Sequence, residues 1–276
     1  MRKLMAIMLF SIIIASSVSA HTLWVQSTRY YIESGGESGT KATMFFGWGH
    51  RIPLDDPIAA EKIKLVELYE PDGKVTAITI SDGRSFHCTP IEYSKEGTYV
   101  LSAETNPGYY TMYLNKSRKM RHYVGPMDEV TDATKIVLSL YVHQYPKSII
   151  TSVKSSGKEL KPVGNQFEIV PEIEPANLKT GSRFSFLVYF DGKVLEKGEA
   201  KYSATYMGYS TEPEKFLYNE REVVNGRGDF DISRPGIWFV EAKYDVPAPE
   251  SLKNKCKTIH YKASLTFAVE ERVRNK

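Results

Sequence analysis

The chain has 276 residues, with 36 lysines and arginines against 33 aspartates and glutamates, and its formal net charge at pH 7 is +3. The net charge of this chain is too close to zero to indicate binding to nucleic acids. Its length is comfortable for two domains of ordinary size.

The N-terminus has the three parts of a cleavable signal peptide. Two basic residues follow the initiating methionine, an apolar run covers residues 4–14, and small residues end at Ala20. This run is much shorter than the roughly 20 residues that a membrane-spanning helix needs. The sequence therefore predicts a signal peptide over residues 1–20, export to the periplasm and no stable membrane insertion, with a mature chain that begins at His21.

The first half of the mature chain consists of short segments in which apolar and polar residues alternate, a pattern that favours β-strands. The strands predicted here are residues 40–46, 64–69, 75–80, 98–103 and 109–114. Residues 131–145 do not alternate cleanly. Thr131 or Asp132 can cap a short helix there, and a buried strand is the alternative.

Residues 152–166 are rich in Ser, Gly, Lys and Pro, which predicts a linker. Strands are expected again at 167–170, 183–190, 199–206, 237–244 and 261–269. The expected fold is all-β, with two tandem antiparallel β-sandwiches of the immunoglobulin or transthyretin sort. The predicted domains are residues 21–151 and 167–270, followed by a tail at 271–276.

His21 is the first candidate metal ligand. If the chain is cut after Ala20, His21 carries a free α-amino group beside its imidazole, and the amine and ring Nδ1 can chelate one ion. Both groups lose their protons close to neutral pH, as metal binding requires. Nitrogen ligands of this kind suit Cu(II) and Ni(II). The alternative is a histidine placed there by chance.

Further histidines can complete the ligand set. His50 follows a probable strand and two nearby glycines, which let the backbone bring a side chain close to a ligand. His87 adjoins Cys88, and His260 lies close after Cys256. A disulfide between the two cysteines, expected of a pair in an oxidising compartment, would draw His87 and His260 together. Two unrelated buried thiols are the alternative.

The sequence contains none of the common catalytic motifs. There is no Gly-x-Ser-x-Gly, no phosphate-binding loop, no dinucleotide-binding fingerprint and no His-Glu-x-x-His. Its carboxylates are scattered. We therefore expect a binding protein and no enzyme.

The chain resembles a family of bacterial periplasmic proteins of unknown function, the NikM-like proteins, which are described as components of nickel or cobalt uptake systems. The resemblance is clearest in residues 167–195, 226–238 and 261–267, and includes an opening Ala-His followed by Leu-Trp, here residues 20–24. A Gly-His pair after an early strand, Gly49-His50, also matches. The two cysteines depart from the family pattern.

The resemblance implies capture of nickel, cobalt or copper at the cell envelope, beside a TonB-dependent receptor or a metal transporter of the ABC or energy-coupling type. Two alternatives remain from the residues themselves. One is a copper-dependent oxidative enzyme similar to the lytic polysaccharide monooxygenases, which also use an N-terminal histidine. The other is a structural or interaction module that needs no metal.

Overall fold

The computed structural model describes residues 20–33, 40–157, 160–197 and 199–271. The predicted signal peptide lies outside these residues except for Ala20. The described residues form strands and four single-turn 3-10 helices, with no α-helix among them. The 3-10 helices are η1 (Ala60–Lys62), η2 (Met127–Glu129), η3 (Pro175–Asn177) and η4 (Glu250–Leu252).

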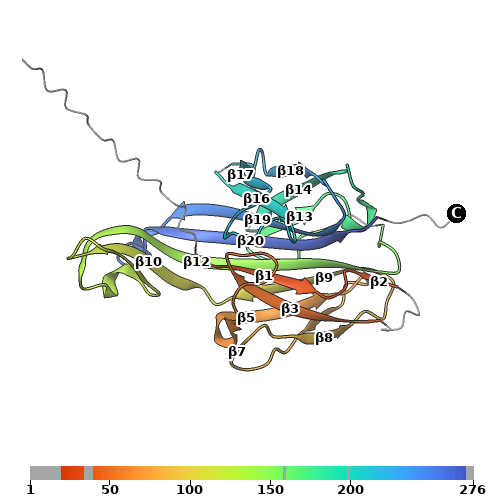
Figure 1. Cartoon of the computed structure of the whole chain (residues 1–276), viewed down its shortest axis with the longest axis horizontal. Coiled ribbons are helices and arrows are strands. Elements are labelled where there is room, and N and C mark those ends of the chain that lie inside the picture. The colour runs from red at the N-terminus through yellow and green to blue at the C-terminus, as the bar shows by residue number, and fades with distance from the viewer. Residues whose placement is uncertain (1–19, 34–39, 158–159, 198, 272–276) are drawn as a thin grey trace, which may run out of the picture.

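One large sheet runs through the middle of the molecule (Figure 1). Its main path, in spatial order, is β17 (Tyr218–Glu222), β16 (Lys201–Tyr206), β19 (Gly236–Pro247), β20 (Thr258–Val269), β12 (Ala133–Ser152), β9 (Gly97–Thr105), β5 (Ile63–Tyr69) and β6 (Val75–Ala77). Three further strands join it through β12 or each other: β2 (Tyr31–Ile32), β10 (Gly108–Asn115) and β11 (Met120–Tyr123).

Smaller sheets cover the large one. A three-stranded sheet contains β1 (Thr22–Ser27), β3 (Lys41–Gly49) and β8 (Thr89–Glu92), and a four-stranded sheet contains β13 (Phe167–Pro171), β14 (Arg183–Phe190), β15 (Lys193–Val194) and β18 (Arg227–Asp231). A two-stranded sheet pairs β4 (Ile58–Ala59) with β7 (Arg84–Ser85). In Figure 1 the three-stranded and four-stranded sheets lie on opposite sides of β12 and β20.

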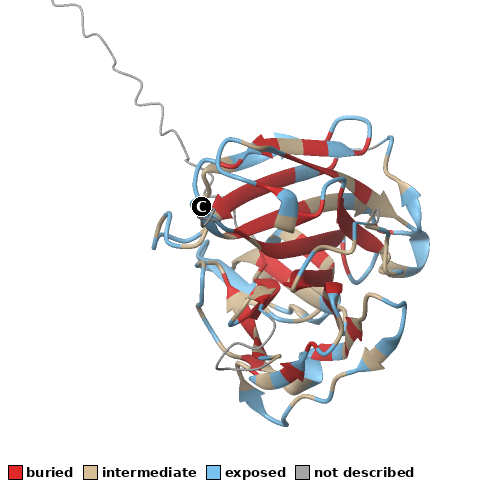
Figure 2. Ribbon diagram, turned by 90° about the vertical axis from the view of Figure 1, so that its right-hand side faces the viewer, coloured by how far each residue is buried: buried red, intermediate tan, exposed pale blue. Residues whose placement is uncertain are grey.

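Strand β12 belongs to both halves of the molecule. Ile149 packs in an apolar core with β13, β14 and β20, whereas the next residue, Ile150, packs in a second core with β1, β3 and β9. Successive side chains of a strand point to opposite faces, so a single strand supplies both cores. Figure 2 shows the buried residues concentrated on these central strands.

The predicted all-β sandwich fold is confirmed, with two differences. The segment 131–145 is the start of β12, so the helix alternative was wrong. Its alternation is broken because its pairing with β10 shifts register between Met112 and Tyr113 and again between Leu114 and Asn115. The second difference is that β12 and β20 pair in parallel, although most other pairs are antiparallel.

The two predicted domains are not physically separate, because one sheet contains strands of both halves. The two cores draw mainly on residues 23–103 and 167–269, on either side of the predicted linker, but β12 contributes Ile150 to the first of them and Tyr145 and Ile149 to the second. However, the large sheet joins both halves. The domain boundaries stay a prediction, and the structure adds that the two sandwiches share a sheet.

A buried ion pair fastens the linker to β12. Lys147 Nζ lies 2.7 Å from Glu168 Oε2, and both side chains are almost fully buried. Glu168 also accepts hydrogen bonds from the backbone N–H groups of Val163 and Gly164. A buried charge needs such partners, because its desolvation is otherwise uncompensated.

Replacing Lys147 with methionine should lower the free energy of unfolding by about 3–5 kcal/mol, since Glu168 is left as a buried charge without its cation. Denaturant unfolding of the purified protein measures this. The matched control is Lys154→Met, which removes an exposed pair with Glu96 and should cost at most about 1 kcal/mol. Equal effects of the two substitutions would contradict the assignment.

Candidate metal centre

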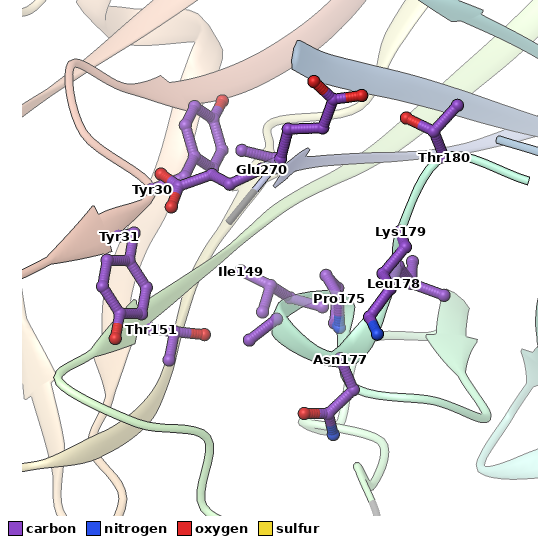
Figure 3. Close-up of a pocket in the computed structure, with 13 residues that line it drawn as sticks. Tyr30, Tyr31, Ile149, Thr151, Pro175, Asn177, Leu178, Lys179, Thr180 and Glu270 are labelled. Atoms are coloured by element: carbon purple, nitrogen blue, oxygen red, sulfur yellow. The ribbon is translucent and has the colours of Figure 1, made fainter. Parts of the chain in front are cut away.

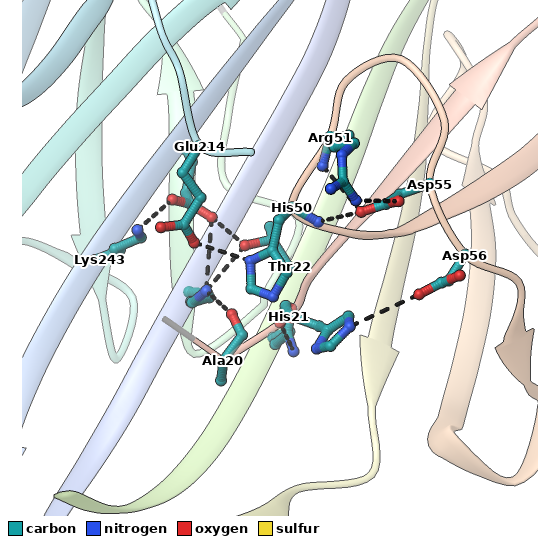
Figure 4. A network of polar contacts seen from close by, with 12 residues as sticks. Ala20, His21, Thr22, His50, Arg51, Asp55, Asp56, Glu214 and Lys243 are labelled. Carbon is teal, nitrogen blue, oxygen red and sulfur yellow. Dashed lines mark hydrogen bonds and ion pairs between the residues drawn. The ribbon is translucent and has the colours of Figure 1, made fainter. Parts of the chain in front are cut away.

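The pairing of β1 with β3 brings His21 and His50 together. The two strands are antiparallel and Thr22 lies opposite Gly49, so the residues just beyond this pair, His21 and His50, are neighbours. Their ring centroids are 4.5 Å apart. Residues far apart in sequence thus meet at one end of a two-stranded ladder, as Figure 4 shows.

The turn after β3 fixes the position of His50. Gly49 has a φ of +142°, a region that L side chains rarely adopt, and a Cβ there would lie 2.4 Å from Asp55 Oδ2. The same carboxylate accepts hydrogen bonds from the backbone N–H groups of His50 and Arg51. A glycine is therefore required at position 49 by the close approach of Asp55.

Glu214 orients the ring of His50 from the other half of the chain. Its Oε1 lies 3.0 Å from His50 Nδ1 (Figure 4). Burial by itself would raise the pKa of Glu214, but the hydrogen bond to His50 and the charges of Lys243 and Lys262 hold it below its usual value. The ionised carboxylate can only accept, so Nδ1 is the donor in this bond and Nε2 is the ring nitrogen that Glu214 does not use.

The ring of His21 lies between an indole and a carboxylate. It stacks on Trp48 with a centroid separation of 5.4 Å, and its Nε2 is 3.9 Å from Asp56 Oδ2. Burial and, next, the neighbouring His50 lower the pKa of His21. The imidazole is therefore neutral at a lower pH than a free histidine, and its Nδ1 is the nitrogen on the side of its own backbone.

Side chains of the large sheet hold the backbone of β1 at its free edge. Gln144 accepts from the N–H of Leu23 and donates to the carbonyl of His21. Ser264 and Thr266 donate to the carbonyls of Leu23 and Val25. Because β3 uses the other edge of β1, these bonds satisfy groups that would otherwise be buried without partners.

A buried charge network lies beneath the start of β1. Lys262 Nζ donates to the carbonyl of Ala20 and to Thr22 Oγ1, at 2.6 and 2.9 Å, and Thr22 donates to Glu241. Glu241 also pairs with Lys243 at 2.8 Å. Burial alone would raise the pKa of Glu241, but Lys243 and Lys262 outweigh it and lower that pKa to about 2. The pKa of Lys262 is lowered to about 8, chiefly by burial.

The ring of His87, another predicted metal ligand, is held by protein groups in this structure. The side chain is buried against Phe46 in the core formed with β1, β3 and β9, and Nε2 donates to the carbonyl of Ile58 at 2.9 Å. Nδ1 lies within hydrogen-bond distance of Ser81 and Ser85. Both ring nitrogens are therefore occupied by protein groups, and His87 has a structural role.

His260 also lies apart from the pair formed by His21 and His50. It is on β20, where its Nδ1 is 2.5 Å from Asp245 Oδ1. The cysteines do not bring it to His87, because Cys88 and Cys256 are free cysteines, the first exposed and the second buried. The expected disulfide is thus not formed. Burial raises the pKa of the Cys256 thiol, which disfavours the thiolate that a metal would need.

The described part of the chain contains no preassembled cluster of three or more His, Cys, Asp or Glu side chains able to hold a metal ion. What the site offers is a pair of imidazoles, each with one nitrogen facing a carboxylate. A third nitrogen, the α-amine of His21, exists only in a chain that begins at this residue.

Sequence reasoning missed the residues that surround this pair. Glu214 and Gln144 are 164 and 123 positions from His50 and His21, and no local pattern connects them. Trp48, Asp55 and Asp56 lie close to the Gly-His motif in the sequence. This closeness was the only sequence feature that could have indicated that they surround the two histidines.

A large cavity lies elsewhere in the molecule. It measures about 750 Å³ and is lined by Tyr30, Tyr31, Ile149 and Leu178 among others, with no candidate ligand on its wall (Figure 3). Within the described ranges, no helix is long and apolar enough to cross a membrane.

Comparison with known proteins identifies a family without a known activity. The family model for a domain of unknown function, DUF4198, matches residues 18–246. No curated protein matches the chain. One similar solved structure is the "D0-D1 domain of Intimin", with 11% sequence identity, 90% of this chain and 99% of that chain covered, and a TM-score of 0.22. A likeness this distant carries no argument about function.

Replacing Gln144 with alanine should destabilise the fold by about 1–3 kcal/mol for each buried backbone group left unpaired, here the N–H of Leu23 and the carbonyl of His21. Denaturant unfolding measures the loss, and hydrogen exchange should become faster at Leu23. As the control, Asn106→Ala removes an exposed bond to Glu61. Unchanged protection of the Leu23 amide would contradict the role given to Gln144.

The charge network also predicts an acid transition. Because the folded-state pKa of Glu241 is about 2 against an ordinary 4.5, its contribution to stability is full above about pH 4.5 and is lost as the pH falls toward 2. Free energies of unfolding measured from pH 7 down to 2.5 should decline over this range. The slope should flatten in Glu241→Gln and stay steep in the exposed control Glu250→Gln. Parallel curves for all three proteins would refute the assignment.

Proposed function

We propose that this chain, which belongs to the family of the domain of unknown function DUF4198, is a binding protein for a transition-metal ion. The ion is held by the α-amine and Nδ1 of His21 and by Nε2 of His50. The site forms when cleavage after Ala20 frees the amine. The protein takes up the ion and passes it on, without chemical turnover.

The observation that carries this proposal is the 4.5 Å separation of the His21 and His50 rings. Histidine at the first position of the processed chain would be unremarkable alone. Its direct contact with a second histidine, contributed by the opposite strand, is what an amine-imidazole chelate needs for a third nitrogen ligand.

The neighbours of both rings support the same donor set. Glu214 accepts from Nδ1 of His50, and a metal-ligating histidine usually donates its second ring nitrogen to such a carboxylate. Asp56 lies on the Nε2 side of His21, which leaves Nδ1 for the chelate with the amine. The lowered pKa of His21 favours the neutral ring that binds a metal.

An all-nitrogen set of this kind suits Cu(II), Ni(II) and Co(II), with copper bound most tightly in the usual order of affinities. The side chain of His21 is 43% exposed, so the ion can be exchanged with a partner. The similarity to the NikM-like proteins supports nickel or cobalt as the cargo in the periplasm. The partner would then be a TonB-dependent receptor or a metal transporter of the ABC or energy-coupling type.

Calorimetric titration of the protein beginning at His21 with Ni²⁺, Co²⁺ and Cu²⁺ tests the proposal. We expect one tight event for each ion, tightest for copper. An otherwise identical protein with one extra residue before His21 should lose this event, because its amine is converted to a peptide nitrogen.

Two substitutions refine the test. His50→Ala should weaken the tight event, whereas His122→Ala, which removes an exposed histidine bonded to Tyr110, should leave it unchanged. Equal affinity of the processed and extended proteins would disprove the chelate.

A further inference from the structure

His260 is a buried histidine with one unused ring nitrogen. Only 8% of the residue is exposed, and Nδ1 is bonded to Asp245. Nε2 is buried and has no hydrogen-bond partner among the described residues. An orphaned buried polar atom is costly, and proteins retain few of them without a reason.

The carboxylate of Asp245 determines what this nitrogen can do. Burial lowers the pKa of His260, more than the bond to Asp245 raises it, and so the ring is neutral. With the proton on Nδ1 facing Asp245, Nε2 carries a lone pair. A histidine held by a carboxylate at one nitrogen, with the other free, is the usual arrangement of a metal ligand.

His260 lines a pocket of about 350 Å³ that is rich in carboxylates. Its wall includes four carboxylate residues, Glu199, Glu220, Glu241 and Asp245, and two lysines, Lys201 and Lys243. Glu241 is already paired with Lys243. The buried Lys262 also lies beside Glu241 and acts on His260. Four carboxylates thus stand against three ammonium groups, and the small negative excess favours a cation over an anion as the occupant.

Ala20 forms part of the wall of the same pocket. It packs against Leu140 and Val142, and Val142 lies directly beside His260 in the pairing of β12 with β20. Removal of residue 20 would thus uncover the strand next to His260. It would also place the new α-amine of His21 at the edge of this pocket, since Ala20 and His21 are bonded.

We propose that His260 is a second binding site for a divalent transition-metal ion, opened by removal of Ala20 and completed by carboxylates of the pocket rim. The proposal rests on the processing invoked in the proposed function. Because only one nitrogen is preformed, this site binds more weakly than the chelate at His21. Glu199 and Glu220 are both exposed and supply the oxygen ligands.

The test uses protein that begins at residue 21 and carries His50→Ala and His21→Ala, so that the first site is absent. Titration with Cu²⁺ is followed by calorimetry and by the NMR signals of the histidine rings, which paramagnetic copper broadens nearby. We expect one weak event, with the His260 signals broadened first. Adding His260→Gln should abolish the event, and adding the control His122→Gln should not change it.

A second variant, Asp245→Asn, tests the proposal if His260→Gln does not fold. The Asp245 side chain is 61% exposed, so the substitution should leave the fold intact. We expect it to weaken the event about 10- to 100-fold, as for other carboxylates that orient metal-ligating histidines. Restoring Ala20 to the N-terminus should abolish the event as well. Copper binding that persists in His260→Gln, or is equal with and without Ala20, would overturn the proposal.

The outcome is separable from that of the proposed function. If the unsubstituted processed protein shows no tight event, the proposed chelate at His21 is refuted. If the protein lacking His21 and His50 shows no weak event, only the proposed site at His260 is refuted.

Discussion

The position of the first strand depends on hydrogen bonds from side chains of the large sheet to the backbone edge of β1. Gln144 on β12 and Ser264 and Thr266 on β20 bind groups that no strand pairs. Residues of β20 alternate between the apolar core of the second half and this polar surface under β1. The polar face of β20 is therefore buried. Its bonds to the backbone of β1 fix the position of this strand, and with it the position of His21 next to His50. The rest of the site is built around that placement.

Much of the strand content was predictable because local alternation and turn residues govern it. The expected strand at residues 183–190 has the same bounds as β14, and β13 begins at Phe167 as expected. The segment from residue 131 was ambiguous because its pairing with β10 contains two register shifts, which interrupt the alternation. The sharing of one sheet by both halves was not predictable, since the parallel pairing of β12 with β20 joins residues more than 100 positions apart.

The candidate site was predictable only in part, for the same reason. His21 and His50 each stand in a recognisable local context, a predicted processing point and a glycine-flanked turn. Their contact, however, depends on the register of β1 against β3. His87 looked equivalent in sequence, yet the carbonyl of Ile58 and two serines occupy its ring. Glu214 could not be found, because its bond to His50 is made across the two halves.

The contact between the first and the last strands has a consequence for the order of assembly. β20 ends at Val269, close to the end of the chain, yet it carries the side chains on which β1 rests. During synthesis or export the N-terminal residues therefore emerge long before their supporting surface exists. Such sequence-distant contacts are slow to form. We therefore expect the histidine pair to be among the last parts of the molecule to reach its final geometry, although His21 precedes most of the chain.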